Sequence, residues 1–214
     1  MTLDEGLGGI VRDAVARALE RAGAPRGLRT ELLRPSDDTL WDTATQAALL
    51  WSARSGRDAT ELAQALCGVL RGEPEIGRCD AVSPGYLNIR IDDRVLMDAA
   101  LSHWGAQRRD EIPLLPTGHP MGAGPPFTRR LGALLAFGLY PQDTPDAGHP
   151  AVRRLLGRLV SVRAALERGK GLPEEMARLT ADFEPCHRER VLTEPLVCSV
   201  REAARMLIRT YKGG

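Results

Sequence analysis

Three polar residues in one short segment of the chain have side chains that could bind a nucleic acid. Residues 86–91 alternate between polar and apolar types, which is the period of a strand with one face in the core. The predicted strand places Tyr86, Asn88 and Arg90 together on its solvent-exposed face. A tyrosine ring can stack on an unpaired base, an amide can donate and accept at a base edge, and an arginine can bind a phosphate. The alternative interpretation is an ordinary exposed face that happens to carry polar residues.

Other residue types that could do chemistry lack catalytic or metal-binding spacing. The sequence has no phosphate-binding loop, dinucleotide fingerprint, GxSxG motif or HExxH motif. Two carboxylate pairs, Asp37-Asp38 and Asp92-Asp93, fall where turns and helix caps favour aspartate. The histidines and cysteines share no ligand spacing, and we expect the cysteines to be buried thiols; these residues are His103, His119, His149, His187, Cys67, Cys79, Cys186 and Cys198. We therefore predict no metal, no cofactor and no catalytic residue.

The elements that must position this strand indicate an α+β module over residues 1–105. Apolar residues recur at helical spacing from Leu7 to Ala22, and Gly23 and Pro25 predict the end of that helix. Further apolar patterns predict strands at 28–33 and 76–82 and helices at 43–53, 59–70 and 92–104. The expected domain combines these helices with a small antiparallel sheet.

The rest of the chain is expected to be a linker followed by a helical bundle. Residues 106–126 are rich in proline and glycine, which predicts a linker or a docked irregular segment. Residues 127–214 carry only helical patterns, and Pro150 falls at a favoured first-turn position. The helices are expected at 127–139 and 150–168, then from Pro173 onward, with a last one marked by apolar residues from Val200 to Tyr211. The predicted fold class is thus α+β, with an N-terminal α+β module and a C-terminal all-α domain.

Charge is distributed unevenly along the sequence. Residues 1–125 hold 14 arginines against 18 acidic residues, and the remaining residues hold 13 arginines and two lysines against 10 acidic residues. A polyanion would therefore be attracted to the second part, whereas the first would bind through shape and local contacts. An ordinary solvated surface would give the same imbalance. Without an apolar run long enough to span a membrane, and with no signal-like N-terminus, the sequence predicts a cytoplasmic protein.

Four stretches of the first part carry a recognisable family pattern. They are VRDAVARALERAGAP at 11–25, Trp41-Asp42, DATELAQALCGVL at 58–70 and SPGYLNIRI at 83–91. These residues resemble the N-terminal additional domain of arginyl-tRNA synthetases, which in that family meets the outer corner of the tRNA near the D loop. The resemblance implies that Ser83, Tyr86 and Asn88 contact tRNA.

The second part resembles the helical anticodon-binding domain of the same synthetases, named for its Asp-Ala-Leu-Arg motif. HPAVRRLL at 149–156 is similar to one helix of that family, and residues 127–136 are similar to another, with Arg130 at an arginine position of the motif. The resemblance implies a tRNA contact at Arg130. Instead of reading an anticodon, the bundle could hold phosphates through Arg153, Arg154, Arg158 and Arg163, or it could bind another partner. Pro126 and Cys186-His187 depart from the family pattern. The HIGH and KMSKS signatures of the synthetase catalytic domain are absent from this sequence.

These features predict a non-catalytic tRNA-binding paralogue of arginyl-tRNA synthetase. We expect it to bind tRNA-Arg, with the first domain on the outer corner and the second on the anticodon arm. It would deliver the tRNA to another enzyme or regulate one, such as a synthetase or an enzyme that uses aminoacyl-tRNA. One alternative is a module that has lost RNA and binds proteins. Another is an enzyme whose site uses linker residues such as His119.

Overall fold

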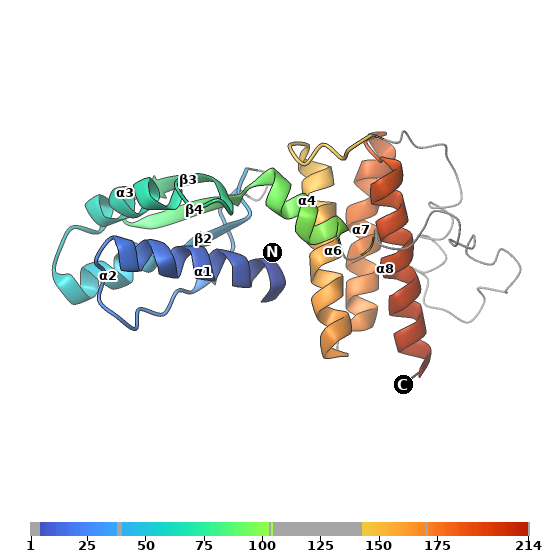
Figure 1. The fold of residues 1–214 in the computed structure, drawn as a ribbon, viewed down its shortest axis with the longest axis horizontal. Helices are drawn as coiled ribbons and strands as arrows, with labels where there is room; N and C mark the ends of the chain where they lie inside the picture. Colours follow the sequence, from blue (N-terminus) through green and yellow to red (C-terminus); the bar gives the residue numbers. More distant parts are fainter. Residues whose placement is uncertain (1–4, 38–39, 103, 105–142, 170, 214) are drawn as a thin grey trace, which may run out of the picture. The chain divides into compact units, whose positions relative to one another are not determined.

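The computed structural model describes residues 5–37, 40–102, 104, 143–169 and 171–213 (Figure 1). The chain divides into two compact units, Met1–Val95 and Leu96–Gly214. The linker predicted at 106–126, the helix predicted at 127–139, Arg130 and His119 all lie outside the described residues. So do the predicted domain boundaries at 105 and 126.

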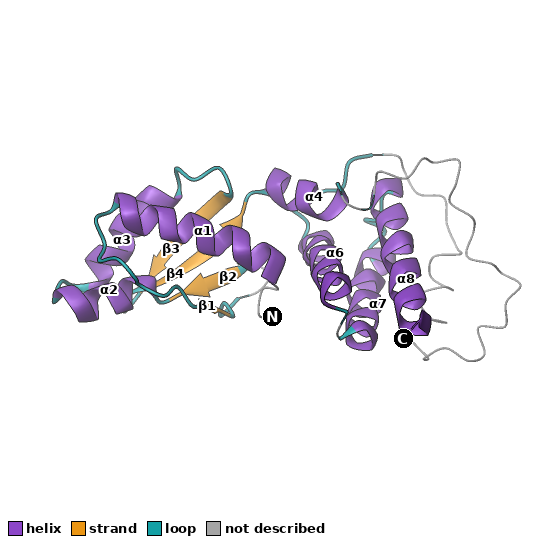
Figure 2. Cartoon of the chain, turned by 60° about the horizontal axis from the view of Figure 1, so that its bottom comes forward, coloured by secondary structure: helices purple, strands orange, loops and turns teal. Residues whose placement is uncertain are grey.

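The first unit is an antiparallel sheet with helices packed on it (Figure 2). The sheet order is β1-β2-β4-β3, and its strands are β1 (Leu32–Leu33), β2 (Thr43–Thr45), β3 (Ile76–Val82) and β4 (Tyr86–Ile91). The helices are α1 (Glu5–Arg21), α2 (Ala47–Ser55) and α3 (Ala59–Leu70). Helix α3 contacts β3 and β4, α2 contacts β4, and α1 packs on α3. The predicted α+β fold class is confirmed.

The core of this unit lies between α3 and the sheet. Leu62, Leu66 and Leu70 recur on one face of α3 and are fully buried. Apolar residues of β4 close the core from the sheet side. This contact explains both periods in the sequence, because a helix buries every third or fourth residue whereas a strand buries every second.

The start of the second predicted helix was wrong. Thr43–Thr45 forms β2 rather than helix, and α2 begins at Ala47. The three β2 residues are buried and pair with β4, and the Thr43 hydroxyl donates to the carbonyl oxygen of Leu33 at 3.1 Å. Threonine favours strands, and here sheet pairing overrides the helical spacing of the neighbouring apolar residues. The strand predicted at 28–33 is likewise reduced to Leu32–Leu33.

After β4 the chain forms α4 (Asp93–Leu101), within the helix predicted at 92–104. The described part of the second unit then contains α6 (Pro150–Arg168), α7 (Leu172–Arg188) and α8 (Glu194–Gly213), which contact one another pairwise. Helix α6 begins at Pro150 and ends at Arg168, and the next residue, Gly169, has a φ of 66° that is accessible to glycine. Helix α8 begins earlier than the predicted apolar pattern, which started at Val200.

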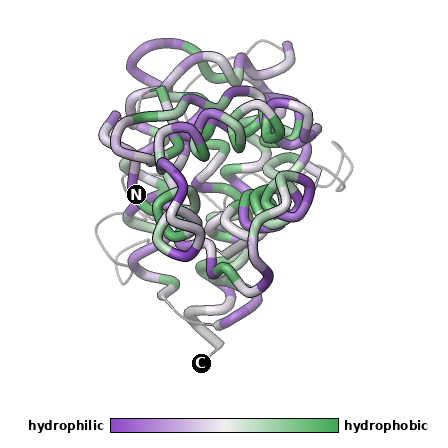
Figure 3. Tube along the Cα trace, turned by 90° about the vertical axis from the view of Figure 1, so that its left-hand side faces the viewer, coloured by the Kyte–Doolittle hydropathy of each residue, from purple (hydrophilic) through white to green (hydrophobic). Residues whose placement is uncertain are grey.

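Hydrophobic and hydrophilic stretches alternate along the helices, as expected where one face of each helix lies in a core (Figure 3). In the second unit the buried residues include Leu155, Leu156, Leu159 and Phe183. Within the described residues, no helix combines the length and apolar character needed to cross a membrane.

Candidate nucleic-acid interface

The apolar half of the β4 alternation is confirmed in the structure, but the prediction that Asn88 is exposed was wrong, because that residue is buried. Leu87, Ile89 and Ile91 are 0–1% exposed and face the helices. Tyr86, Asn88 and Arg90 therefore lie on the opposite face of the strand. Their cross-strand neighbours on β3 are Val82 beside Tyr86, Asp80 beside Asn88 and Arg78 beside Arg90. We call these six residues the β3–β4 face.

The turn before β4 fixes how Tyr86 and Ser83 are presented. The Gly85 amide donates to the carbonyl oxygen of Val82 at 3.0 Å, which closes the hairpin. Gly85 has a φ of 147°, and a Cβ atom built there would lie 2.8 Å from the Cβ atom of Ala59. Only glycine can let the turn approach the start of α3 this closely. Ser83 is exposed and Tyr86 is partly exposed beside this anchored turn.

Asn88 is less accessible than the predicted exposed face implies. It is 9% exposed, because Asp80 on β3 and Ala44 on β2 flank it in register. Exposure on this face is greater at Tyr86 and at Val82, which is 43% exposed. A ligand would therefore reach the tyrosine ring more readily than the amide.

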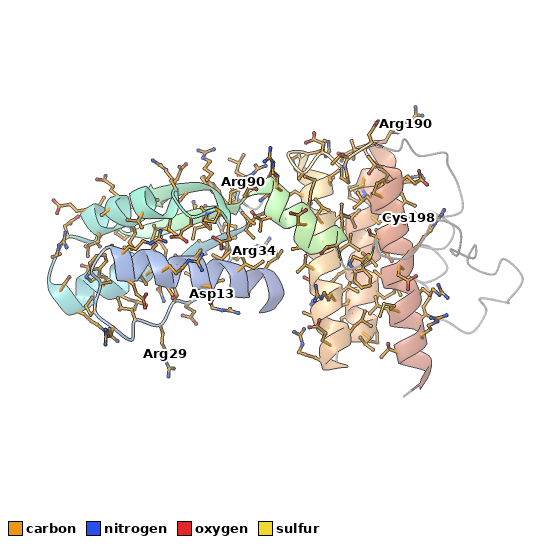
Figure 4. The ribbon with its side chains drawn as sticks, viewed as in Figure 1. Asp13, Arg29, Arg34, Arg90, Arg190 and Cys198 are labelled. Atoms are coloured by element: carbon orange, nitrogen blue, oxygen red, sulfur yellow. The ribbon has the colours of Figure 1, made fainter. Side chains whose placement is uncertain are left out.

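The arginines of the β3–β4 face are paired with carboxylates. Arg90 lies at the end of β4, and its Nη2 atom is 3.4 Å from Oδ1 of Asp93, at the start of α4 (Figure 4). Nη2 of Arg78 is 2.6 Å from Oδ2 of Asp80. Each guanidinium thus has a carboxylate beside it, and neither charge stands alone on this face.

Trp41, which the sequence analysis named only as part of a family motif, packs against an arginine of this face. The guanidinium carbon of Arg78 lies 4.6 Å from the ring centroid of Trp41, an arrangement typical of a cation–π contact. Trp41 is 8% exposed, whereas the Arg78 side chain is 57% exposed. The ring therefore supports an arginine that remains accessible. Alternation could not have placed Arg78 beside Arg90, because the strand register shifts between Ile76 and Arg78, and the Trp41 contact likewise depends on the fold.

The predicted arginines of the helical unit occupy different environments. Arg158 is buried, with Nε 2.8 Å from Oδ2 of Asp182 and Nη1 3.2 Å from Oε2 of Glu175. Arg153 is also buried, at 6% exposed. Arg154 is partly exposed and is the most accessible of these three. Arg163 is partly exposed and pairs with Glu167 along the same helix.

A row of basic residues on α8 was missed. Arg201, Arg205 and Arg209 follow one another at intervals of four, which places them on one side of the helix. Arg209 is exposed and the other two are partly exposed. Their spacing in the sequence was the signal that could have identified them.

Three of the four cysteines match the expected buried thiols. Cys67, Cys79 and Cys186 are buried, whereas Cys198 is partly exposed. Burial raises the pKa of Cys186 to about 12. Within the part of the chain that is described, no cluster of three or more histidine, cysteine or carboxylate side chains could hold a metal ion.

Comparison with known proteins relates the first unit to one family. Residues 9–91 match the family described as the arginyl tRNA synthetase N terminal domain. The arginine–tRNA ligase of Methylorubrum extorquens strain PA1 is 32% identical over 109 residues, covering 48% of this chain and 19% of the ligase. The ligase of Methylobacterium nodulans is 34% identical over 85 residues, covering 38% of this chain and 14% of the ligase. That of Solidesulfovibrio magneticus is 32% identical over 80 residues, with shares of 37% and 14%.

The first unit is therefore a small α+β domain with helices on one side of its sheet and polar side chains on the other. Over residues 9–91 this unit is similar to the arginyl tRNA synthetase N terminal domain family. The similarity is confined to the N-terminal region and spans less than a fifth of each of these ligases.

Proposed function

We propose that this protein binds tRNA without catalysing aminoacylation, and that tRNA-Arg is its preferred ligand. The first unit would bind the outer corner near the D loop, and the helical unit would bind the anticodon arm. The protein would act in the cytoplasm, delivering the tRNA to another enzyme or regulating one. The main support is the partly exposed Tyr86 beside an anchored turn, within a domain matched to the N-terminal domain of an arginine–tRNA ligase.

Base stacking supports this role more strongly than charge does. Arg90 is paired with Asp93, and Asp80 is shared by Arg78 and Arg71, so these carboxylates weaken the attraction of the face for phosphates. A stacked base needs only an accessible aromatic surface, and every base has one to offer. In this proposal Tyr86 stacks on an unpaired base, Asn88 and Ser83 make hydrogen bonds beside it, and Arg90 reaches the neighbouring backbone.

In the helical unit the proposal rests on Arg154 among the described predicted residues. Arg158 is held by two carboxylates in the interior and contributes to helix packing in this arrangement. On α8 the exposed Arg209 adds a further phosphate-binding group, whereas the partly exposed Arg205 has its Nη1 atom 3.5 Å from Oε2 of Glu202. Arg130 remains part of the proposal on the basis of the family resemblance alone.

The absence of catalysis is also a proposal. It is supported by the extent of the similarity, which reaches only the N-terminal domain of the ligases. A partner enzyme would then supply the chemistry, and we propose a synthetase or an enzyme that uses aminoacyl-tRNA. Activity should accordingly be sought in mixtures with such enzymes.

A protein-binding role is the second candidate. The observation that favours it is the balanced charge of the β3–β4 face together with the exposed Val82, because such a surface resembles a protein interface as much as a nucleic-acid site. Binding to RNA separates the two candidates. A protein-binding module would bind a tRNA pool no better than it binds other polyanions.

The test is a titration of the full chain against tRNA-Arg and other tRNAs at several salt concentrations. Tyr86→Ala should weaken tRNA binding roughly 5- to 150-fold, since stacking on an aromatic residue contributes about 1–3 kcal/mol per base. Val82→Ala is the matched control, because Val82 lies directly across from Tyr86 but has no ring. Absence of tRNA binding even at low salt would reject the proposal, and equal effects of the two variants would reject the stacking site.

A further inference from the structure

Two cysteines that are distant in sequence meet in the interior of the first unit. Cys67 lies on the buried face of α3 and Cys79 lies on β3, and they are 3% and 0% exposed. Their Sγ atoms are in direct contact at 2.6 Å.

The surroundings give the two thiols different reactivity. With Cys79 as donor, the hydrogen bond to the Cys67 sulfur lowers the pKa of Cys67; burial opposes this effect, the Arg71 charge supports it and the Asp80 charge opposes it, with a net lowering. The same hydrogen bond and burial raise the pKa of Cys79. Cys67 is therefore the better nucleophile, because the thiolate is the reactive form.

The backbone around the pair is already held in place. Nε and Nη2 of Arg71, at the end of α3, donate to the carbonyl oxygen of Cys79 at 3.2 Å and 3.0 Å. Helix and strand are thus joined next to the two sulfur atoms. A covalent bond between Cys67 and Cys79 would connect elements that are neighbours in the reduced protein.

We propose that Cys67 and Cys79 form a redox-active pair that a hydroperoxide converts to a disulfide. The Cys67 thiolate attacks one oxygen of hydrogen peroxide, the O–O bond breaks, and protonation of the leaving oxygen gives water and a sulfenic acid. The Cys79 sulfur then attacks the Cys67 sulfur, its proton leaves with the hydroxyl group as a second water, and the S–S bond forms. Two thiols lose two electrons in total, and a dithiol reductant reverses the reaction.

The bond would stabilise the unit against unfolding without changing its surface. A link between α3 and β3 restricts the unfolded chain, while the folded arrangement stays as Arg71 already holds it. The β3–β4 face points away from the buried sulfur atoms, so its ligand should bind equally well in both states. Oxidation would thus preserve the protein during oxidative stress.

Peptide mapping of the full chain after treatment with hydrogen peroxide tests the proposal. Cleavage after arginine places Cys67 in peptide 58–71 and Cys79 in peptide 79–90. After alkylation without reductant, we expect the two peptides to be linked by a disulfide, and dithiothreitol should separate them. The oxidised monomer should also have a higher melting temperature than the reduced monomer. Cys67→Ser should abolish the disulfide-linked peptide pair and the rise in melting temperature, and Cys186→Ser should leave both unchanged.

The proposal would be overturned if the disulfide between the two peptides were found only in covalent dimers, or if Cys198 were the only cysteine oxidised. Alkylation of both Cys67 and Cys79 in peroxide-treated, folded wild-type protein would do the same. The wild-type measurements stand even if Cys67→Ser fails to fold.

Discussion

Glu73 is a charged residue in the interior that no motif identified. It is 2% exposed and accepts hydrogen bonds from Nε of Arg17 at 2.8 Å and from Nη1 of Arg21 at 2.6 Å. The hydrogen bond with Glu73 raises the pKa of Arg17. Because both arginines belong to α1, this carboxylate fixes α1 to the segment between α3 and β3. The two charge-assisted hydrogen bonds offset the free-energy cost of burying the Glu73 carboxylate.

Replacing Glu73 with glutamine should lower the free energy of unfolding by about 1–3 kcal/mol, the usual contribution of hydrogen bonds to a charged group. Denaturant unfolding of the full chain measures this loss. Glu75→Gln is the matched control, because Glu75 also contacts Arg17 but its side chain is 27% exposed. Equal losses in the two variants would contradict a special role for the buried carboxylate.

Arginines illustrate what the sequence could and could not predict at this scale. Alternation placed Arg90 on the correct side of β4, because a strand has only two faces. Arg158 was predicted to bind phosphate but is buried against Glu175 and Asp182. Its carboxylate partners come from α7, so only the packing of two helices reveals that its charge is already engaged. Spacing within one helix carries no information on such pairs.

Elements with a long, regular apolar pattern were predicted well, and short ones were not. Helix α3 and strand β4 match their predicted ranges, since each buries a full repeat of apolar residues. Strand β2 has only three residues, too few for any period to be detected. Strand β2 forms because it pairs with β4, whose residues lie more than forty positions later in the sequence.

The β3–β4 hairpin depends on one glycine for its contact with α2 and α3. A Cβ atom at Gly85 would meet Ala59 at 2.8 Å and Leu49 at 3.1 Å, in a backbone conformation that other residues rarely adopt. Gly85→Ala should therefore destabilise the protein by about 1–3 kcal/mol. Gly68→Ala in α3 should have the opposite sign and stabilise by roughly 0.5–1 kcal/mol, because that site has open space and a helical backbone. Thermal unfolding of both variants checks the pair, and a neutral Gly85→Ala would show that the turn can move away from α3.

The two units are proposed to bind tRNA through different physical interactions. The charge of the first unit's face is balanced locally, whereas the second part of the sequence carries the excess of basic residues. Affinity from stacking is nearly independent of salt, but each phosphate contact adds about 0.7–0.9 to the slope of log K against log salt. One salt series can therefore separate the contributions of the two units.

Tyr86→Ala should lower tRNA affinity with the salt slope unchanged, and Arg154→Ala should reduce the slope by about 1. The two residues belong to different compact units, so their free-energy losses should add within about 0.5 kcal/mol in the double variant. Arg29→Ala is the charge-loss control, since Arg29 projects from the loop after α1 (Figure 4). If Arg154→Ala behaves like Arg29→Ala while Tyr86→Ala weakens binding, the tRNA contact belongs to the first unit and the helical unit has another partner.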